Sequence, residues 1–290
     1  MKLQFNDLPS EIIYIILKKL NEFDLCNLYL SNPNYFTKYI YNILINNDNN
    51  TWLSITKYML KNGDILDKKY NNFINIFINK INWNYITINC ILSEEFIIKY
   101  KNYIIWNNIS IYQSLSENFI TQYKNIIDWN NITKYQILSE NFIIQNKDNL
   151  NFNNVCKYQK LSENFITQYK NIIDWNIISK YQKLSESFIQ NNIDNINWLY
   201  ISIYQILSEQ FIEIYKNKLS WNNILKYQTL SEKFIKKYED EIDWTLISEY
   251  QQLSEEFIRE YKNKISWFYI CRYQNLSKEF IREFKNYLYI

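Results

Sequence analysis

Apolar and polar positions recur along this 290-residue chain with a fixed period of 23 residues, nine times from Trp83 onward, without an insertion or deletion. An aromatic residue, a Leu-Ser pair and a Phe-Ile pair return in every repeat, and a Tyr-Gln pair returns in eight of the nine. A fixed period in the twenties is typical of a solenoid, in which each unit buries its apolar face against its neighbours.

Within one repeat, the spacing predicts two helices. In the repeat that begins at Trp129, apolar residues stand three and four apart, first around Ile132 and then around Phe142. Ser139 and its equivalents precede an acidic residue in eight repeats, which predicts a helix N-cap. An Asn or Asp four residues before the next aromatic predicts a left-handed C-cap. We expect helices of about nine and ten residues.

The array has an irregular beginning. Trp52, Ile55 and Tyr58 keep the spacing of the later repeats, but Phe73 arrives eight residues late, so the segment 60–68 is predicted to contain an inserted loop. The chain is therefore predicted to be all-α, with a helical module in residues 1–45, a linker and degenerate capping repeat in 46–82, and nine tandem repeats in 83–290.

The first module has its own apolar stripe. Leu8-Pro9 precedes Ile12, Ile16 and Leu20, which share one helix face, and Leu17, Leu25 and Leu28 follow the same helical pattern. This segment resembles an F-box, the helical module that docks substrate receptors onto the Skp1 adaptor of cullin ubiquitin ligases. The resemblance covers about 40 of the 290 residues. It implies that the Skp1-binding residues are Leu8, Pro9, Ile12, Ile16, Leu17, Leu20 and Leu25.

The resemblance has limits and an alternative. Ser31-Asn32 and Tyr35 stand where the family prefers Val-Ser and Trp, which puts the third helix of the module in question. The segment could also be an apolar helix that only caps the solenoid. An F-box before a long repeat array, in a chain rich in Asn, Ile, Lys and Tyr, is similar to F-box proteins of giant, mimivirus-like viruses.

Composition narrows the function classes. The chain has 32 basic and 30 acidic residues, so its net charge creates no overall electrostatic attraction for nucleic acid or membranes. No apolar run approaches the roughly 18 residues of a membrane span. The four scattered cysteines fit a reducing compartment. The absence of histidine and the single glycine argue against an enzyme, a cofactor site and a metal site. We expect a cytoplasmic protein, in the host cytoplasm if the chain is viral.

Repeat-constant residues are predicted to build the stack. The tryptophans and the tyrosines of the Tyr-Gln pairs are expected to be buried, and the glutamines to hydrogen-bond along the array. Cys156 and Cys271 occupy a slot held elsewhere mostly by Ser or Thr and are interpreted as small core residues. Among the variable positions, five lysines would form a basic strip, which is either a solvated face or a docking site for an acidic partner segment: Lys134, Lys157, Lys160, Lys180 and Lys183.

These features predict a substrate-recruiting adaptor. The F-box-like module would hold a Skp1–cullin ligase and the solenoid a target protein, so that ubiquitin is transferred by proximity. This role would place the chain in the ubiquitin conjugation pathway and, if it is viral, in a host–virus interaction. The alternatives are a nucleic-acid-binding solenoid and a purely structural repeat protein without ligase contact. Nucleic acid is disfavoured because stacking would need exposed aromatic residues.

Overall fold

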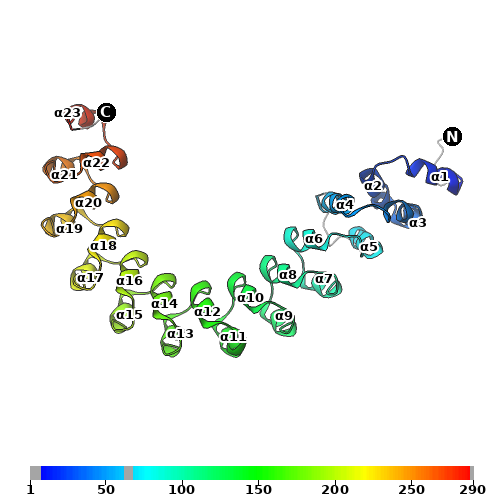
Figure 1. Ribbon diagram of the computed structural model, residues 1–290, viewed down its shortest axis with the longest axis horizontal. Coiled ribbons are helices and arrows are strands. Elements are labelled where there is room, and N and C mark those ends of the chain that lie inside the picture. The colour runs from blue at the N-terminus through cyan, green and yellow to red at the C-terminus, as the bar shows by residue number, and fades with distance from the viewer. Residues whose placement is uncertain (1–7, 62–67, 288–290) are drawn as a thin grey trace. The chain divides into compact units, whose positions relative to one another are not determined.

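The computed structural model describes residues 8–61 and 68–287, and all of their regular secondary structure is helical. This confirms the predicted all-α solenoid of two-helix repeats that follows an N-terminal helical segment. The chain divides into two compact units, unit 1 (Met1–Leu138) and unit 2 (Ser139–Ile290). Figure 1 shows their helices in chain order.

Unit 1 begins with three helices, α1 (Ser10–Leu17), α2 (Glu22–Ser31) and α3 (Pro33–Leu44). The side chains of Asn21 and Asn32 cap α2 and α3, and Pro33 takes the first turn of α3, where its missing N–H costs no hydrogen bond. The third helix of the module therefore forms despite its unusual sequence.

A degenerate repeat follows, made of α4 (Asn49–Lys61) and α5 (Lys68–Ile76). Trp52 is buried against Phe73 and Phe77, with ring centroids 6.3 and 5.0 Å away, and Tyr29 of α2 contacts Phe73 at 5.2 Å. Helix α4 extends into the segment predicted to be an inserted loop, of which residues 62–67 lie outside the described residues.

The regular repeats each contribute two short helices. The first helices are α6 (Trp83–Asn89), α8 (Trp106–Tyr112), α10 (Trp129–Tyr135), α12 (Phe152–Tyr158), α14 (Trp175–Tyr181), α16 (Trp198–Tyr204), α18 (Trp221–Tyr227), α20 (Trp244–Tyr250) and α22 (Trp267–Tyr273). The second helices are α7 (Glu94–Lys99), α9 (Glu117–Gln122), α11 (Glu140–Gln145), α13 (Glu163–Gln168), α15 (Glu186–Asn191), α17 (Glu209–Ile214), α19 (Glu232–Lys237), α21 (Glu255–Glu260) and α23 (Lys278–Glu283), with a 3-10 turn η2 (Lys147–Asn149) after α11.

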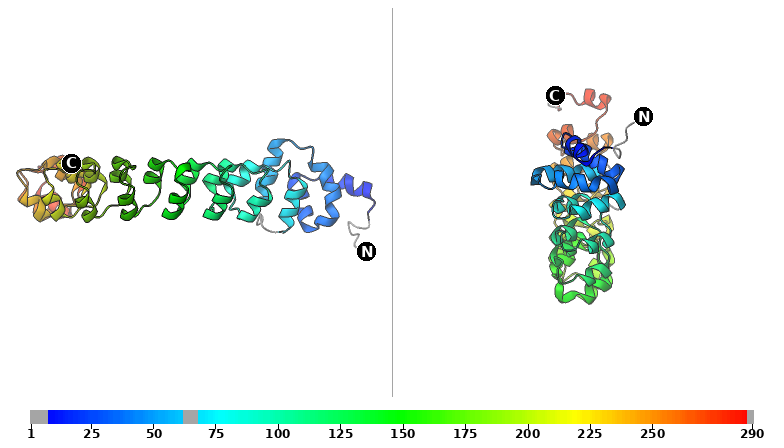
Figure 2. Two further views of the ribbon diagram at one scale, coloured as in Figure 1. Left: turned by 90° about the horizontal axis from the view of Figure 1, so that it is seen from below. Right: turned by 90° about the vertical axis from the view of Figure 1, so that its right-hand side faces the viewer.

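In unit 2 the two kinds of helix form two rows. Consecutive first helices from α12 to α22 pack on one another. They lie along the inner side of a curved row, and the second helices lie along its outer side (Figure 1). Figure 2 shows the same helices from two other directions. The exposed side of the first helices is therefore available as one continuous face of this unit.

The helices are shorter than predicted, with seven residues in each first helix and six in each second helix. Gln182 and its equivalents end the first helix because their backbone is extended (φ −93°, ψ 147°). The second helix ends at residues such as Tyr169, whose carbonyl accepts both the Ile172 and Ile173 N–H groups. No described residue has a positive φ, so the predicted left-handed C-caps are wrong.

The predicted N-caps of the second helices are confirmed. In all nine second helices the serine of the Leu-Ser pair accepts a hydrogen bond from the backbone N–H of the phenylalanine three residues later, as Ser185 does from Phe188 at 3.1 Å. The caps of the first helices are less regular, since Ser220 and Ser266 make no such bond and Ile105 cannot.

In unit 2, a buried or half-buried glutamine ties each repeat from α14 to α22 to the one before it. Gln182 donates through Nε2 to the carbonyls of Cys156 and Gln159, at 2.6 and 2.8 Å. Its Oε1 accepts the N–H of Leu161 at 3.0 Å. Four further glutamines repeat this set of bonds, which confirms the predicted hydrogen-bonded column: Gln205, Gln228, Gln251 and Gln274.

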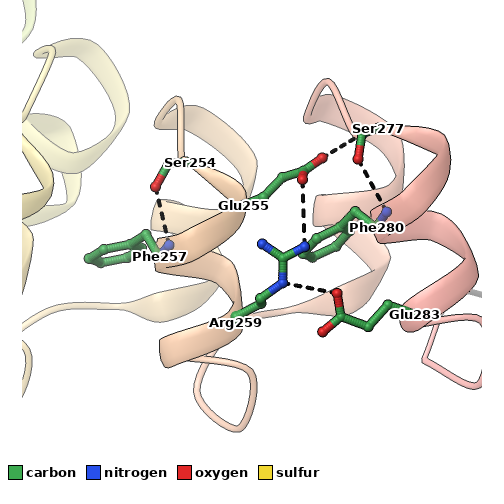
Figure 3. Close-up of polar contacts among 7 residues, drawn as sticks. All are labelled: Ser254, Glu255, Phe257, Arg259, Ser277, Phe280 and Glu283. Carbon is green, nitrogen blue, oxygen red and sulfur yellow. Dashed lines mark hydrogen bonds and ion pairs between the residues drawn. The ribbon is translucent and has the colours of Figure 1, made fainter.

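Carboxylates on the second helices add a second tie. Glu255 accepts the Ser277 N–H of the next repeat at 2.6 Å, and this bond holds the pKa of Glu255 below its ordinary value of 4.5 (Figure 3). Arg259 lies between Glu255 and Glu283, with its guanidinium 4.9 Å from the centre of the Phe280 ring. The repeats are thus joined at both the inner and the outer helix.

We expect Gln251→Ala to lower the free energy of unfolding by a few kcal/mol, because each buried backbone group left unpaired costs about 1–3 kcal/mol. The exposed neighbour gives a matched control: Gln252→Ala should change it by less than about 0.5 kcal/mol. Urea unfolding monitored by circular dichroism measures both. Equal effects of the two changes would show that the hydrogen bonds of the Gln251 side chain do not stabilise the contact between repeats.

The lowered pKa of Glu255 predicts a pH dependence. The ionised carboxylate stabilises the folded chain, so its contribution is present above the ordinary pKa of 4.5 and is lost as the pH falls below it. The Tm of wild type should exceed that of Glu255→Gln near neutral pH, and the gap should close in acid. Glu256→Gln is the control on the same helix. A gap that does not vary with pH would contradict the argument.

Candidate functional site

The first candidate surface is an apolar face on α1 and α2. Ile12 and Ile15 are 43% and 54% exposed. Beside them is an open groove of about 460 Å³, whose apolar lining is Ile16, Leu20 and Leu28 and whose polar rim is Asp24, Asn27 and Ser31. Clustered exposed apolar side chains of this kind mark an interaction site more often than scattered ones do.

The structure separates the residues predicted to bind Skp1 into two groups. Ile12, Ile16 and Leu20 lie on the exposed face or in the groove, and Leu8 and Pro9 precede α1 with Pro9 exposed. Leu17 and Leu25 are only 0% and 1% exposed. They belong to the core of the module, so they have almost no exposed surface for a partner, and their assignment as partner contacts stays a prediction.

The module also packs on the degenerate repeat. Asn27 donates to the Tyr58 hydroxyl at 2.7 Å, Phe23 lies 4.7 Å from the Tyr58 ring, and Tyr41 stacks on Phe77 at 5.6 Å. These contacts come from α2 and α3. The module therefore caps the array with those helices and leaves the face that contains Ile12 and Ile15 open.

The second candidate surface is a column of exposed tyrosines on the first helices of unit 2, and the same position is exposed in unit 1. The tyrosines of the Tyr-Gln pairs are between 37% and 54% exposed, contrary to the prediction that they are buried: Tyr112, Tyr135, Tyr158, Tyr181, Tyr204, Tyr227, Tyr250 and Tyr273. Each is the last residue of a first helix that buries an isoleucine, or Val155 in α12. In all of these helices except α22, the residue after that aliphatic one is buried as well. The repeat-constant tyrosine is therefore a surface residue.

Lysines of the predicted basic strip lie against these rings. Lys157 Nζ is 4.9 Å from the Tyr158 centroid and 5.4 Å from that of Tyr181 in the next repeat. Lys180 Nζ is within 5.7 Å of the rings of Tyr181, Tyr200 and Tyr204. Hydrogen bonding to Tyr181 raises the pKa of Lys180 above its ordinary value. Both ammonium groups thus lie against tyrosine rings at the surface.

The strip divides between the two units. Lys157, Lys160, Lys180 and Lys183 belong to consecutive repeats of unit 2, whereas Lys134 belongs to unit 1, where its Nζ is 4.9 Å from Tyr135. No ion pair joins the four lysines of unit 2 to a carboxylate of the described chain. Nearer the C-terminus, by contrast, charges are paired between repeats, as in Lys216–Glu241 at 3.3 Å.

A groove of about 320 Å³ opens between the tyrosines of α14 and α16. Its lining combines charge with apolar surface: Lys180, Tyr181, Gln182, Lys183, Leu184, Tyr204, Gln205 and Ile206. The two glutamine amides are already bonded to backbone groups, so lysines and tyrosines remain to contact a ligand. Ile206 is 86% exposed. Sequence reasoning missed the two tyrosines and Ile206.

The cysteines take no part in either surface. None of the four described cysteines forms a disulfide, and burial raises the pKa of the Cys26 thiol to about 12 and that of Cys156 to about 11. Such thiols stay protonated at neutral pH and are poor nucleophiles. Cys156 fills the core slot that was predicted for it. Within residues 8–61 and 68–287, no group of three His, Cys, Asp or Glu side chains could hold a metal ion.

No protein-family model, curated protein or solved structure matches this chain. In the part of the chain that the structure describes, no helix has the length and apolar character needed to cross a membrane. The function is therefore inferred from the apolar face of the module and the tyrosine column of the repeats.

We expect Tyr181→Ala to cost about 1 kcal/mol of unfolding free energy, since the ring loses two cation–π contacts at the surface. Tyr238→Ala should cost about 3–5 kcal/mol, because Tyr238 is buried against Trp221 and Phe234. Denaturant unfolding of the two variants tests the distinction. A larger loss from Tyr181→Ala would show that the exposed column is structural.

Proposed function

We propose that this protein is a substrate-recruiting adaptor without chemistry of its own. Its N-terminal module binds a Skp1-like adaptor of a cullin ubiquitin ligase, and its repeats bind a target protein. The observation that carries the proposal is the open apolar groove formed by Ile16, Leu20 and Leu28, with Ile12 and Ile15 exposed beside it. In an F-box, the corresponding leading stripe faces the adaptor.

The packing of the module supports this role. Because α2 and α3 already hold the module to α4 and α5, a partner can cover α1 and the groove without disturbing the array. Burial of the exposed isoleucines by a partner would be favourable, at roughly 25 cal/mol for each Å² of apolar surface removed from water. The module thus has one side for the repeats and one for a partner.

The repeats suit the second half of the role. Side chains on the first helices return at a fixed spacing, which presents a long surface to a partner rather than a closed pocket. Holding a target and a ligase on one chain raises their effective concentration for each other. Such an adaptor would act in the cytoplasm, and in that of the host if it is encoded by a virus.

A nucleic-acid-binding solenoid is the second candidate. The exposure of the tyrosine column favours it, because bases stack on exposed aromatic rings and lysines contact phosphates. The surroundings of the column, however, are more consistent with a protein ligand, as argued below.

Capture of purified Skp1 tests the adaptor role. The double change Ile16→Asp and Leu20→Asp should abolish capture, since a charge placed in an apolar interface without a counter-charge costs several kcal/mol. The thermal transition should shift little, because both side chains lie at an open groove. Asn34→Asp with Asn42→Asp, at exposed positions of α3, controls for added charge and should retain capture. The proposal would be refuted if the Ile16→Asp, Leu20→Asp variant captured as much Skp1 as wild type, or if the wild-type chain captured no Skp1.

A further inference from the structure

The exposed residues of three consecutive repeats of unit 2 form a surface that we call the tyrosine–lysine face. It comprises residues from α12, α14 and α16 and from the turns that follow them: Lys157, Tyr158, Lys160, Lys180, Tyr181, Lys183, Leu199, Tyr204 and Ile206. We propose that this face binds an extended segment of the target in which two acidic side chains and one apolar side chain follow one another at intervals of three residues. The inference rests on the proposed function.

The first step is the constancy of the tyrosines. Lys157, Lys180 and Lys226 each contact the tyrosine of the following repeat. The same position holds Ile203 before Tyr227 and Glu249 before Tyr273. At Tyr227 and Tyr273 the cation comes instead from the same repeat, as Lys226 and Arg272. The tyrosine is exposed, so core packing does not account for its presence in every one of these repeats. The rings of Tyr158, Tyr181 and Tyr204 are therefore exposed to a ligand that binds to these three repeats.

The second step is charge. Helices α12, α14 and α16 contain no acidic residue. Carboxylates of the neighbouring segments are already bonded, since Asp174 caps α14 through the Asn176 N–H at 2.8 Å and Glu163 accepts the Ser185 N–H at 2.6 Å. Four lysines therefore face solvent without a carboxylate partner in the described chain. A partner of complementary charge is acidic.

The third step distinguishes a peptide from a nucleic acid. Lys157 and Lys160 flank Tyr158-Gln159, and Lys180 and Lys183 flank the next pair, but Ile203 and Ile206 flank Tyr204-Gln205. The basic surface thus changes to an aliphatic one within a single repeat, at the groove that Ile206 lines. A nucleic acid would use the lysines and the tyrosines and would gain little from exposed isoleucine. A peptide with an apolar side chain uses all three.

The fourth step is spacing. Adjacent packed helices lie about 8–10 Å apart. A chain in the extended polyproline II conformation rises about 3.1 Å per residue with three residues per turn, so side chains three residues apart lie on one face, about 9 Å from each other. One repeat therefore corresponds to about three residues of an extended ligand. Two basic repeats are followed by one aliphatic repeat. The ligand is therefore predicted to have two acidic side chains three residues apart, with an apolar side chain three residues from the second. This order can run in either chain direction.

The test uses the full-length protein and fluorescein-labelled peptides of about fifteen residues in a Gly-Ser background. One carries Glu, Glu and Leu at three-residue intervals, one carries the same order reversed, and a third places the three side by side. We expect one spaced peptide to bind at least about tenfold more tightly than the clustered one in fluorescence anisotropy, and less tightly as salt is added, because charge attraction is screened over about 10 Å at 0.1 M.

Paired variants locate the binding. Two double variants should each lower the affinity for the spaced peptide at least about tenfold. One is Tyr181→Ser with Tyr204→Ser, and the other is Lys180→Ser with Lys183→Ser. Ile206→Ser should lower the affinity for the spaced peptide but should not change the affinity for a peptide that has Gly in place of Leu. The matched controls should stay within about twofold of wild type. They are Tyr250→Ser with Tyr273→Ser, farther along the column, and Ile172→Ser, which is also exposed. Circular dichroism confirms that each variant is folded.

Three outcomes would overturn the inference. The first is equal affinity for spaced and clustered peptides, including no binding of either, and the second is an equal effect of the control variants. The third is tighter binding of a labelled single-stranded oligouridylate that the same tyrosine and lysine changes abolish, which would make the face a nucleic-acid site. Skp1 capture by the same preparations separates the proposals: capture without peptide binding refutes only this inference, and peptide binding without capture refutes only the ligase contact.

Discussion

The buried glutamine amide is the interaction on which the repeat array depends. Helices of six and seven residues are too short to be stable alone in water, so contacts between repeats must hold them. Gln182 supplies such a contact at the point where the first helix ends, because its extended backbone directs the amide to two carbonyls and one N–H of the preceding repeat. These partners lie 26, 23 and 21 residues earlier in the chain. An insertion in any repeat would break this register, which explains why the period never varies.

Much of the fold follows from the sequence because local chemistry and periodicity agree. The serine caps, the glutamine column and the small residue at Cys156 were all predictable, since each depends on a residue type at a fixed position. The helix ends were not. The turns after the second helices close through bonds such as Ile172 N–H to the Tyr169 carbonyl with right-handed geometry, so Asn and Asp there signal a turn rather than a left-handed residue.

The candidate surfaces were harder to predict because a residue that is the same in nearly every repeat need not be buried. The tyrosine of the Tyr-Gln pair is constant and exposed. A projection of the first helix at 3.6 residues per turn carries the missing signal: Trp175, Ile178 and Ser179 share one side with Gln182, and Tyr181 lies outside that arc. In the N-terminal module, Ile16 and Leu17 are adjacent apolar residues of one helix. Only the packing of α2 and α3 shows that Leu17 faces the core and Ile16 the groove.

The nearest-neighbour bonding of the repeats has a consequence for how such a chain can change. Because each glutamine amide bonds only to the adjacent repeat, a whole repeat can be duplicated, deleted or moved in the gene without disturbing distant parts of the array. The interior of every repeat is nearly the same, so the order of the repeats is free to vary while their outward side chains differ. Recombination between the gene segments that encode similar repeats would then change the order of basic and aliphatic repeats along the array. New recognition could arise in this way without a single substitution in the core.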